Sequence, residues 1–186
     1  MDSLAAWNLL NESLHADCVV FKVYRQRFQH PLDQREGDFF TIRSLDWVLT
    51  LPVTSDRRLL LVRQFRFGTR HFSWEPPGGL MESGESPEQA GARELEEETG
   101  YTSQRIRSIG SCAPNPAIFN NTAHFVLAED CTPSGQIQFD VNEEVESRLF
   151  SVHEVDAMLH NGELQHVIAQ AAFFHLRLAR PDLWQG

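Results

Sequence analysis

The chain has 186 residues, of which 41% are hydrophobic and 23% charged, and its formal net charge is -10. This length and composition are those of an ordinary globular protein with a substantial buried core. The negative charge argues against general affinity for nucleic acids or anionic membranes, so an anionic ligand would need local arginines or a bound cation.

The cysteines and the N-terminal residues indicate the expected cellular location of the protein. Cys18, Cys112 and Cys131 are odd in number, widely spaced and without a CxxC pair, which favours reduced thiols. No signal peptide is visible at Met1-Asp2-Ser3, and no apolar run approaches membrane-spanning length. We therefore expect a soluble, cytoplasmic protein whose partners are neither nucleic acid nor membrane.

The first 50 residues are predicted to be one helix followed by strands. A helix is predicted over residues 1–17, because apolar residues recur there at helical spacing: Leu4, Trp7, Leu10 and Leu14. This stripe would face either the core or a second copy of the chain. Residues 18–28 alternate apolar and polar side chains as a strand does, and two more strands are predicted within residues 39–53.

Residues 51–186 are predicted to mix strands with helices. Strands are expected at 59–65, 106–110, 123–128 and 147–152, with turn-rich loops at 113–121 and 130–142. From Val152 the pattern is helical, with a break at Asn161-Gly162 and a second helix to about Ala179. A mixed sheet between helices, hence the α/β class, is the natural architecture.

The most informative stretch is 79–101, GLMESGESPEQAGARELEEETGY. Ser86 is a good N-cap, Pro87 suits the first helical position, and Gln89 completes a capping box. Gly100 lies where a helix usually ends in a left-handed residue. A helix is therefore predicted between Ser86 and Gly100, with Ala92, Leu95 and Thr99 as its candidate core residues.

Glu94, Glu97 and Glu98 are three and four residues apart, so their carboxylates crowd one face of this helix. A hard divalent cation such as Mg²⁺ takes oxygen ligands and would relieve the repulsion. Arg93 can reach back to Glu85 and hold the preceding loop. Taken alone, the three glutamates also fit a solvated acidic face.

The complete stretch resembles the Nudix box, GX₅EX₇REUXEEXGU with U apolar, at every fixed position. The one loose point is Tyr101, where an aliphatic residue is usual. The resemblance implies an α/β/α sandwich with a mixed sheet and a Mg²⁺-dependent hydrolase, with Mn²⁺ as an alternative metal. It also implies metal ligands at Glu94, Glu98, Glu97 and the Gly78 carbonyl, and structural roles in the box for Gly79, Glu85, Arg93 and Gly100.

Outside the box the chain is similar to the ADP-ribose pyrophosphatase-like branch, over roughly residues 19–178. The similarity lies in the segments 61–66, 74–76 and 161–164 and in Pro116. It implies substrate contacts at Arg63, Arg66, Glu75 and Pro116. For the two arginines, a solvated strand surface is an equal alternative. The branch usually has a glycine and an acidic residue after the proline; here Asn120 and Asn121 follow, as turn residues or as readers of a base.

In this branch a glutamate on a loop well after the box acts as the base. Residues 139–146 are the matching segment, and either Glu143 or Glu144 fits, with an exposed acidic loop as the alternative. None of the eight histidines is paired at metal-ligand spacing.

These observations predict hydrolysis of a small nucleotide, first among them ADP-ribose to AMP and ribose 5-phosphate. The alternatives are another nucleotide sugar, a dinucleotide such as NADH, a nucleoside triphosphate, or a non-enzymatic nucleotide-binding domain. Relatives in this branch are homodimers joined through N-terminal strands. The resemblance therefore implies a homodimer in which residues 1–50 form the dimerisation segment and 51–186 the hydrolase domain.

Overall fold

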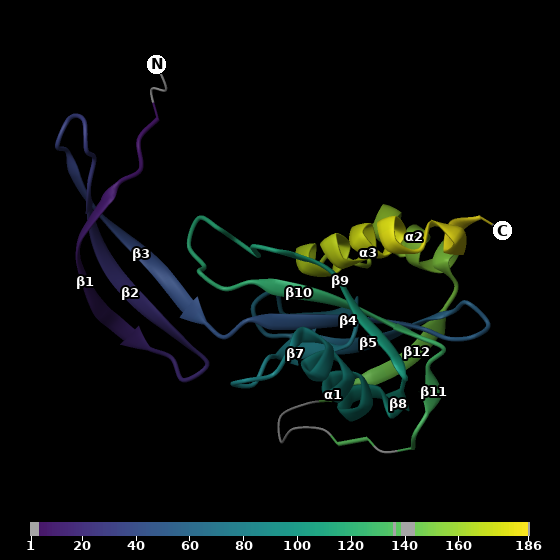
Figure 1. Ribbon diagram of the computed structural model, residues 1–186. Helices are drawn as coiled ribbons and strands as arrows, with labels where there is room; N and C mark the ends of the chain where they lie inside the picture. Colours follow the sequence, from purple (N-terminus) through teal and green to yellow (C-terminus); the bar gives the residue numbers. More distant parts are fainter. Residues whose placement is uncertain (1–3, 136, 139–143, 186) are drawn as a thin grey trace. The chain divides into compact units, whose positions relative to one another are not determined.

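The computed structural model describes residues 4–135, 137–138 and 144–185 (Figure 1). The chain divides into two compact units, Met1–Leu45 with Ala113–Asn121, and Asp46–Cys112 with Thr122–Gly186. Each unit is described by itself.

The first unit is an antiparallel sheet in the order β1-β2-β3, made of Asn8–Asp17, Phe21–Gln29 and Glu36–Ser44. The helix predicted over residues 1–17 is wrong, because Asn8–Asp17 pair with β2 from Asn8↔Gln29 to Asp17↔Lys22. A spacing of four places Leu10 and Leu14 on one face of a strand as well as of a helix. The neighbouring strand, which satisfies the backbone hydrogen bonds, therefore decides the structure.

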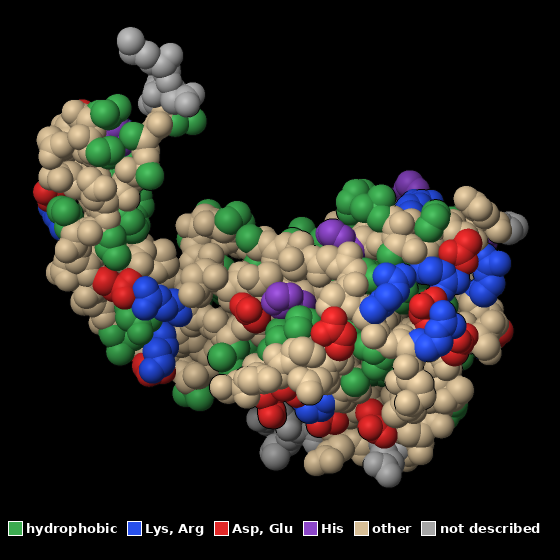
Figure 2. Space-filling model, in the orientation of Figure 1, with side chains coloured by type: hydrophobic (Ala, Val, Ile, Leu, Met, Phe, Trp, Pro, Cys, Tyr) green, Lys and Arg blue, Asp and Glu red, His purple; other side chains and the backbone are tan. Residues whose placement is uncertain are grey.

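Aromatic edge contacts and ion pairs hold this sheet together. Trp7 lies 5.2 Å from His30 and 5.7 Å from Phe39, centroid to centroid. Figure 2 shows hydrophobic side chains at the surface of this unit. The exposed apolar side chains of β1 and β3 include Leu9, Leu10, Leu14, Phe39 and Phe40. No described residue of this unit contributes a fully buried hydrophobic side chain. The sheet thus has no apolar core of its own.

The second unit is built on a sheet in the order β12-β5-β4-β10-β9, with β6 paired to β5 and β7 to β4. Strands β4 and β10 are parallel and the other pairs are antiparallel, which confirms a mixed sheet. The strands are β4 (Trp47–Val53), β5 (Leu59–Arg66), β6 (His71–Glu75), β7 (Gly78–Leu80), β9 (Arg105–Cys112), β10 (Ala123–Glu129) and β12 (Glu146–Phe150), and β8 (Tyr101–Thr102) pairs with β11 (Thr132–Pro133).

Helices cover both faces of this sheet (Figure 1). Helix α1 (Pro87–Thr99) lies on one face, and α2 (Val152–Asn161) and α3 (Val167–Ala179) lie on the other, followed by the short helix η1 (Pro181–Trp184). The central strands supply both cores by alternation: Val48 and Val126 pack with Ala90 of α1, whereas Leu49 and Phe125 join the core under α2 and α3. The predicted α/β/α sandwich is confirmed.

Helix α1 begins and ends where the sequence predicts. The Ser86 hydroxyl accepts from the Gln89 amide, and the Gln89 side chain accepts from the Ser86 amide, which is the capping box. Gly100 has φ of 66°, in the left-handed region. The buried residues are Ala90, Gly91, Glu94, Leu95, Glu98 and Thr99, so Ala92, which was expected in the core, is only partly buried.

The C-terminal helices also follow the prediction. Gly162, with φ of 80°, ends α2 and separates it from α3. Among the described residues, none of the helices has both the length and the apolar character needed to cross a bilayer.

Gly91 brings α1 close to the sheet and yields a first prediction. The Thr50 hydroxyl donates to the Gly91 carbonyl at 2.9 Å, and a Cβ at Gly91 would lie 2.7 Å from that Thr50 oxygen. We expect Gly91→Ala to lower the free energy of unfolding by about 1–3 kcal/mol through overpacking. This loss would outweigh the helix-propensity gain of about 1 kcal/mol. Urea unfolding measures it.

Gly68→Ala is the matched control. A Cβ there meets nothing within 4 Å, and the residue is not left-handed. Its effect should stay within about 0.5 kcal/mol. Equal effects of the two substitutions would show that the contact between α1 and β4 is not as close as described.

Candidate active site

Two glycines of β7 bring backbone against the carboxylates of α1. A Cβ at Gly78 would lie 2.1 Å from the Val48 carbonyl oxygen, and one at Gly79 would lie 2.6 Å from Glu94 Oε1. Only glycine permits this approach. The Gly78 amide donates to Glu98 Oε2 at 2.9 Å. β7 therefore fixes two of the predicted metal-binding glutamates, although the role expected for the Gly78 carbonyl stays a prediction.

Arg93 joins the loop before α1 to the glutamates on it. Its guanidinium donates to Glu85 at 2.9 Å, to the Leu80 carbonyl at 3.0 Å, to Glu94 at 2.8 Å and to Glu97 at 3.1 Å. The hydrogen bonds to Glu85 and then to Glu94 raise the pKa of Arg93 above its ordinary value, so the group stays charged. Arg93 thus fastens the loop to the helix.

The carboxylates of α1 suit a cation by their chemistry. Glu94 and Glu98 are buried and Glu97 is partly exposed. Arg93 brings one positive charge to three carboxylates, those of Glu85, Glu94 and Glu97, so the group stays negative. Within residues 4–135, 137–138 and 144–185, no three His, Cys, Asp or Glu side chains already stand in the geometry of a metal site. The oxygen donors nevertheless fit a hard divalent ion in kind.

A second charged cluster lies in the same unit. Glu75, at the end of β6, is fully buried and accepts from Arg66 Nε at 2.8 Å and Nη2 at 2.6 Å. His166 Nδ1 lies 2.6 Å from Glu75 Oε2. Burial opposes ionisation of Glu75, but the hydrogen bonds from Arg66 and His166 outweigh it and lower the pKa of Glu75 to about 2. Glu75 is therefore an ionised anchor for Arg66.

The second cluster lines a cavity of about 1080 Å³, and so does β7, which contacts the carboxylates of α1. Its lining includes Gly78 and Gly79 of β7, Arg63 and Arg66 of β5, and His166. Arg63 lies over the Phe72 ring at 4.9 Å from its centroid, and its Nη1 is 3.7 Å from Glu146 Oε2. A concave site of this size, with few charged groups among apolar ones, is typical of small-molecule binding.

Neither Pro116 nor Glu144 is among the residues that line the cavity. Pro116 belongs to the loop 113–121 of the first unit. In that loop the Asn115 carbonyl accepts from the Phe119 amide, and the Asn121 side chain donates to the Leu45 carbonyl, which supports the interpretation as turn residues. Glu144 is exposed and outside any helix or strand, and Glu143 lies outside the described residues.

Sequence reasoning missed His166. It lies far from Glu75 in the chain, and neither metal-ligand spacing nor strand periodicity marks it. The one available signal is that His166 is the N-cap residue of α3. Its side chain makes no capping hydrogen bond to the helix in the structure. Its ring nitrogen Nδ1 lies beside the Glu75 carboxylate instead.

A family model and several known proteins are similar to this chain in sequence. A family model described as the NUDIX domain matches residues 45–171. The chain is 39% identical over 83 residues to an ADP-ribose pyrophosphatase of Bacillus subtilis (strain 168), covering 45% of each chain. It is 39% identical over 92 residues to an ADP-sugar pyrophosphatase of Mus musculus, covering 45% of this chain and 40% of the relative. The matches thus span about half or less of these relatives.

A solved structure shows the same fold over nearly the whole chain. The crystal structure of an ADP compounds hydrolase superposes with a TM-score of 0.87 and covers 98% of both chains, at 22% sequence identity. At this identity the likeness shows the fold alone.

The Glu75 cluster predicts how stability depends on pH. Because the pKa of Glu75 is lowered from 4.5 to about 2 in the folded chain, its contribution is complete above pH 4.5 and is lost as the pH falls toward 2. The corresponding free energy is on the order of 3 kcal/mol. Glu75→Gln should therefore destabilise the protein near neutral pH, and the difference from wild type should shrink below pH 4.5, as urea unfolding would measure.

As a control, Glu96→Gln makes the same charge change at a partly exposed position of α1, where no hydrogen bond or ion pair of the Glu96 side chain is found among the described residues. A stability difference for Glu75→Gln that stays constant from pH 7 to pH 3 would contradict the ionised state of Glu75.

Proposed function

This chain belongs to the NUDIX domain family, and from that membership we propose that it hydrolyses the pyrophosphate bond of a nucleoside diphosphate sugar. The proposed substrate is ADP-ribose, cleaved to AMP and ribose 5-phosphate. The observation that carries the proposal is the cavity bordered on one side by β7, which holds the α1 carboxylates, and on the other by Arg63 and Arg66. The names of the two pyrophosphatase relatives support the substrate class.

The glutamates of α1 would hold a divalent metal, Mg²⁺ or alternatively Mn²⁺. Glu94 and Glu98 would be the principal ligands and Glu97 would assist. When bound by these residues, such an ion would supply charge neutralisation at the phosphate oxygens and an activated water for attack on phosphorus. The chain prepares this donor set in advance, because Arg93 and the Gly78 amide fix the carboxylates.

Arg63 and Arg66 would attract the anionic substrate in a chain whose net charge is -10. A diphosphate would be repelled by the overall field, so local donors must offset it. Arg66 is held in one orientation by the two hydrogen bonds that it donates to Glu75, and a guanidinium so oriented loses little conformational freedom when it binds a phosphate. Glu75 therefore acts on substrate through Arg66 rather than by touching it.

A base must accept the proton of the attacking water. The segment 139–146 supplies Glu143 or Glu144 for this role, and the choice between them stays open in the proposal. The proposal also includes a cytoplasmic location. Its partner is a small molecule rather than a nucleic acid, in keeping with the net charge of -10.

The test of the metal assignment is Glu98→Gln. We expect the variant to fold, because a glutamine can still accept from the Gly78 amide, and to lose at least about 100-fold in Mg²⁺-dependent kcat as a metal ligand is removed. The measurement is chromatographic detection of AMP and ribose 5-phosphate from ADP-ribose.

Glu96→Gln, on the same helix, is the control and should keep wild-type turnover. An unchanged rate in Glu98→Gln would overturn the metal assignment. If ADP-ribose is inert while another nucleotide sugar, a dinucleotide or a triphosphate turns over, only the substrate assignment fails. Nucleotide binding without turnover in Mg²⁺ or Mn²⁺ would instead favour a binding domain.

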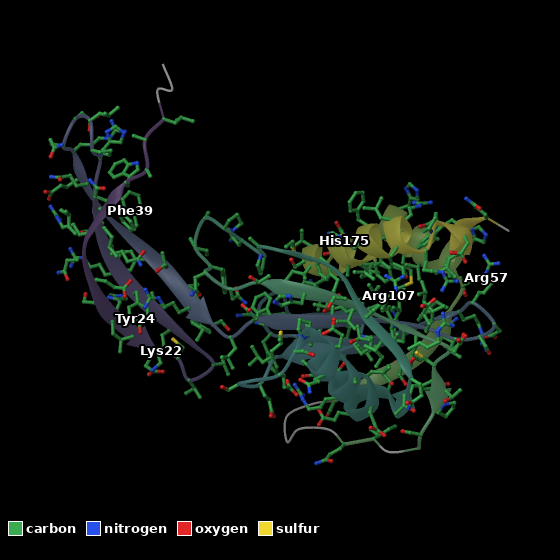
Figure 3. All side chains as sticks on the ribbon, in the orientation of Figure 1. Lys22, Tyr24, Phe39, Arg57, Arg107 and His175 are labelled. Carbon is green, nitrogen blue, oxygen red and sulfur yellow. The ribbon has the colours of Figure 1, made fainter. Side chains whose placement is uncertain are left out.

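We also propose that the protein is a homodimer joined through the first unit. That unit has no buried apolar core in its described residues, and it exposes apolar side chains on β1 and β3. Figure 3 shows Tyr24 on β2 and Phe39 on β3 among the side chains of this sheet. A second copy would cover this surface.

Light scattering at micromolar concentration should therefore give twice the mass of one chain. Leu14→Glu, on the half-exposed outer part of β1, should shift the protein toward monomer, whereas Leu178→Glu on exposed α3 should not. A monomeric mass for the wild type would contradict the proposal.

A further inference from the structure

Arg63 and Phe72 meet across the hairpin formed by β5 and β6. In the antiparallel register Arg63 lies opposite Trp74, so Phe72, two residues away on β6, is its diagonal neighbour on the same face. The guanidinium carbon of Arg63 lies over the Phe72 ring, 4.9 Å from its centroid. Both side chains line the cavity. The ring therefore packs against a cation that borders the cavity.

The Phe72 ring is itself held by a second aromatic side chain of the hairpin. Phe65 lies directly opposite Phe72 in the register, and the two rings meet edge to face with centroids 5.5 Å apart. Edge-to-face pairs of this kind are favourable beyond the area that they bury. The Phe72 residue nevertheless remains 59% exposed. The ring is thus fixed at the surface of the cavity and not within the core.

The hydrogen-bond donors of Arg63 are not used inside the protein. Arg66 donates Nε and Nη2 to Glu75, whereas no hydrogen bond of the Arg63 side chain is found among the described residues. Arg63 Nη1 lies 3.7 Å from Glu146 Oε2, and both of these side chains are well exposed. An ion pair so long and so exposed contributes little. The N–H groups of Arg63 are therefore left for a ligand.

A neutral ring can orient a cation without cancelling its charge. The carboxylate of Glu75 orients Arg66 but also offsets its positive charge. Phe72 brings no charge, and an aromatic face attracts a guanidinium without taking up its hydrogen bonds to oxygen. Arg63 thus keeps both its charge and the forked donors that match the oxygens of a phosphate.

We propose that Phe72 is a positioning residue, which holds Arg63 at the wall of the cavity so that its guanidinium donates to the diphosphate of the substrate. The inference rests on the proposed function, since it assumes that the cavity takes a nucleoside diphosphate sugar. Phe72 acts through Arg63 and does not bind the substrate itself. The two arginines are therefore oriented in different ways, Arg66 by a carboxylate and Arg63 by a ring.

Two substitutions at Phe72 test whether the aromatic face matters. Phe72→Leu keeps an apolar side chain but removes the ring, whereas Phe72→Tyr keeps the ring. Because the residue is more than half exposed, both variants should fold. We expect Phe72→Leu to raise KM for ADP-ribose about 2- to 5-fold with kcat nearly unchanged, as for loss of one exposed cation–π contact. Phe72→Tyr should have the KM of the wild type.

Phe67→Leu is the matched control. It makes the same change at an exposed ring of the same hairpin that is not among the residues lining the cavity, so KM should not change. An unchanged KM in Phe72→Leu would overturn the proposal. A KM in Phe72→Tyr as high as in Phe72→Leu would also overturn it, since the aromatic face would then not be what matters.

A double-mutant cycle with Arg63→Gln tests whether Phe72 acts through the arginine. Once Arg63 is replaced, the ring has no guanidinium to hold, so adding Phe72→Leu to Arg63→Gln should leave KM unchanged. A further rise of 2- to 5-fold in the double variant would contradict the proposal, because Phe72 would then contact the substrate itself or act through the fold.

Binding without turnover gives an independent reading. Isothermal titration calorimetry with an ADP-ribose analogue that has a methylene bridge between its phosphorus atoms should show the Kd of Phe72→Leu raised by the same factor as KM. An unchanged Kd would overturn the proposal and leave the proposed function standing. A wild type that neither binds the analogue nor hydrolyses ADP-ribose would overturn both.

Discussion

The arrangement of the site depends on the guanidinium of Arg93. This one group binds Glu85 and the Leu80 carbonyl on the loop before α1, and Glu94 and Glu97 on the helix itself. Crowded carboxylates repel one another, so an α1 without this cation would gain by turning them outward into water. Arg93 instead keeps them gathered while leaving the group negative overall. The arrangement of the α1 carboxylates therefore depends on the ion pairs of Arg93 with Glu85, Glu94 and Glu97.

The Glu75 carboxylate has a different role from the α1 carboxylates, because it orients the Arg66 cation, which lines the cavity. Glu75 is fully buried and ionised, and such a charge is stable only because Arg66 and His166 both reach it. The result is an oriented cation on one wall of the cavity and a set of held carboxylates behind the other. Under the proposed function, this acidic protein would receive an anionic ligand beside Arg63 and Arg66, which line the cavity, and a metal ion would offset the charge of the α1 carboxylates.

Much of the fold could be predicted because its signals are local. The capping box of Ser86 and Gln89 and the left-handed Gly100 determine where α1 begins and ends, and period-two alternation identifies the buried strands of the second unit. The N-terminal helix was wrong because Leu10 and Leu14 satisfy either periodicity, and only pairing with β2 distinguishes them. Ala92 was misplaced because the buried side of α1 is set by the approach of Gly91 to Thr50, a contact between distant segments.

Some features of the site could likewise be predicted from local spacing, and others could not. Spacing within the box predicted that Arg93 would reach Glu85 and that three glutamates would share one face of α1. Nothing local predicted that Glu75 would be buried beneath Arg66, or that His166 would complete this cluster, because those residues come together only when β5, β6 and the start of α3 pack.

The central claim is that the α1 carboxylates gather a divalent cation for a diphosphate in the adjoining cavity. Crystals grown with Mn²⁺ and a non-hydrolysable ADP-ribose analogue test it directly, because anomalous scattering locates the ion. The account predicts a manganese peak bound by oxygens of Glu94 and Glu98 and by the diphosphate of the analogue. Carboxylates that contact only Arg93, the Gly78 amide and water, with the analogue bound and no ion beside them, would contradict it.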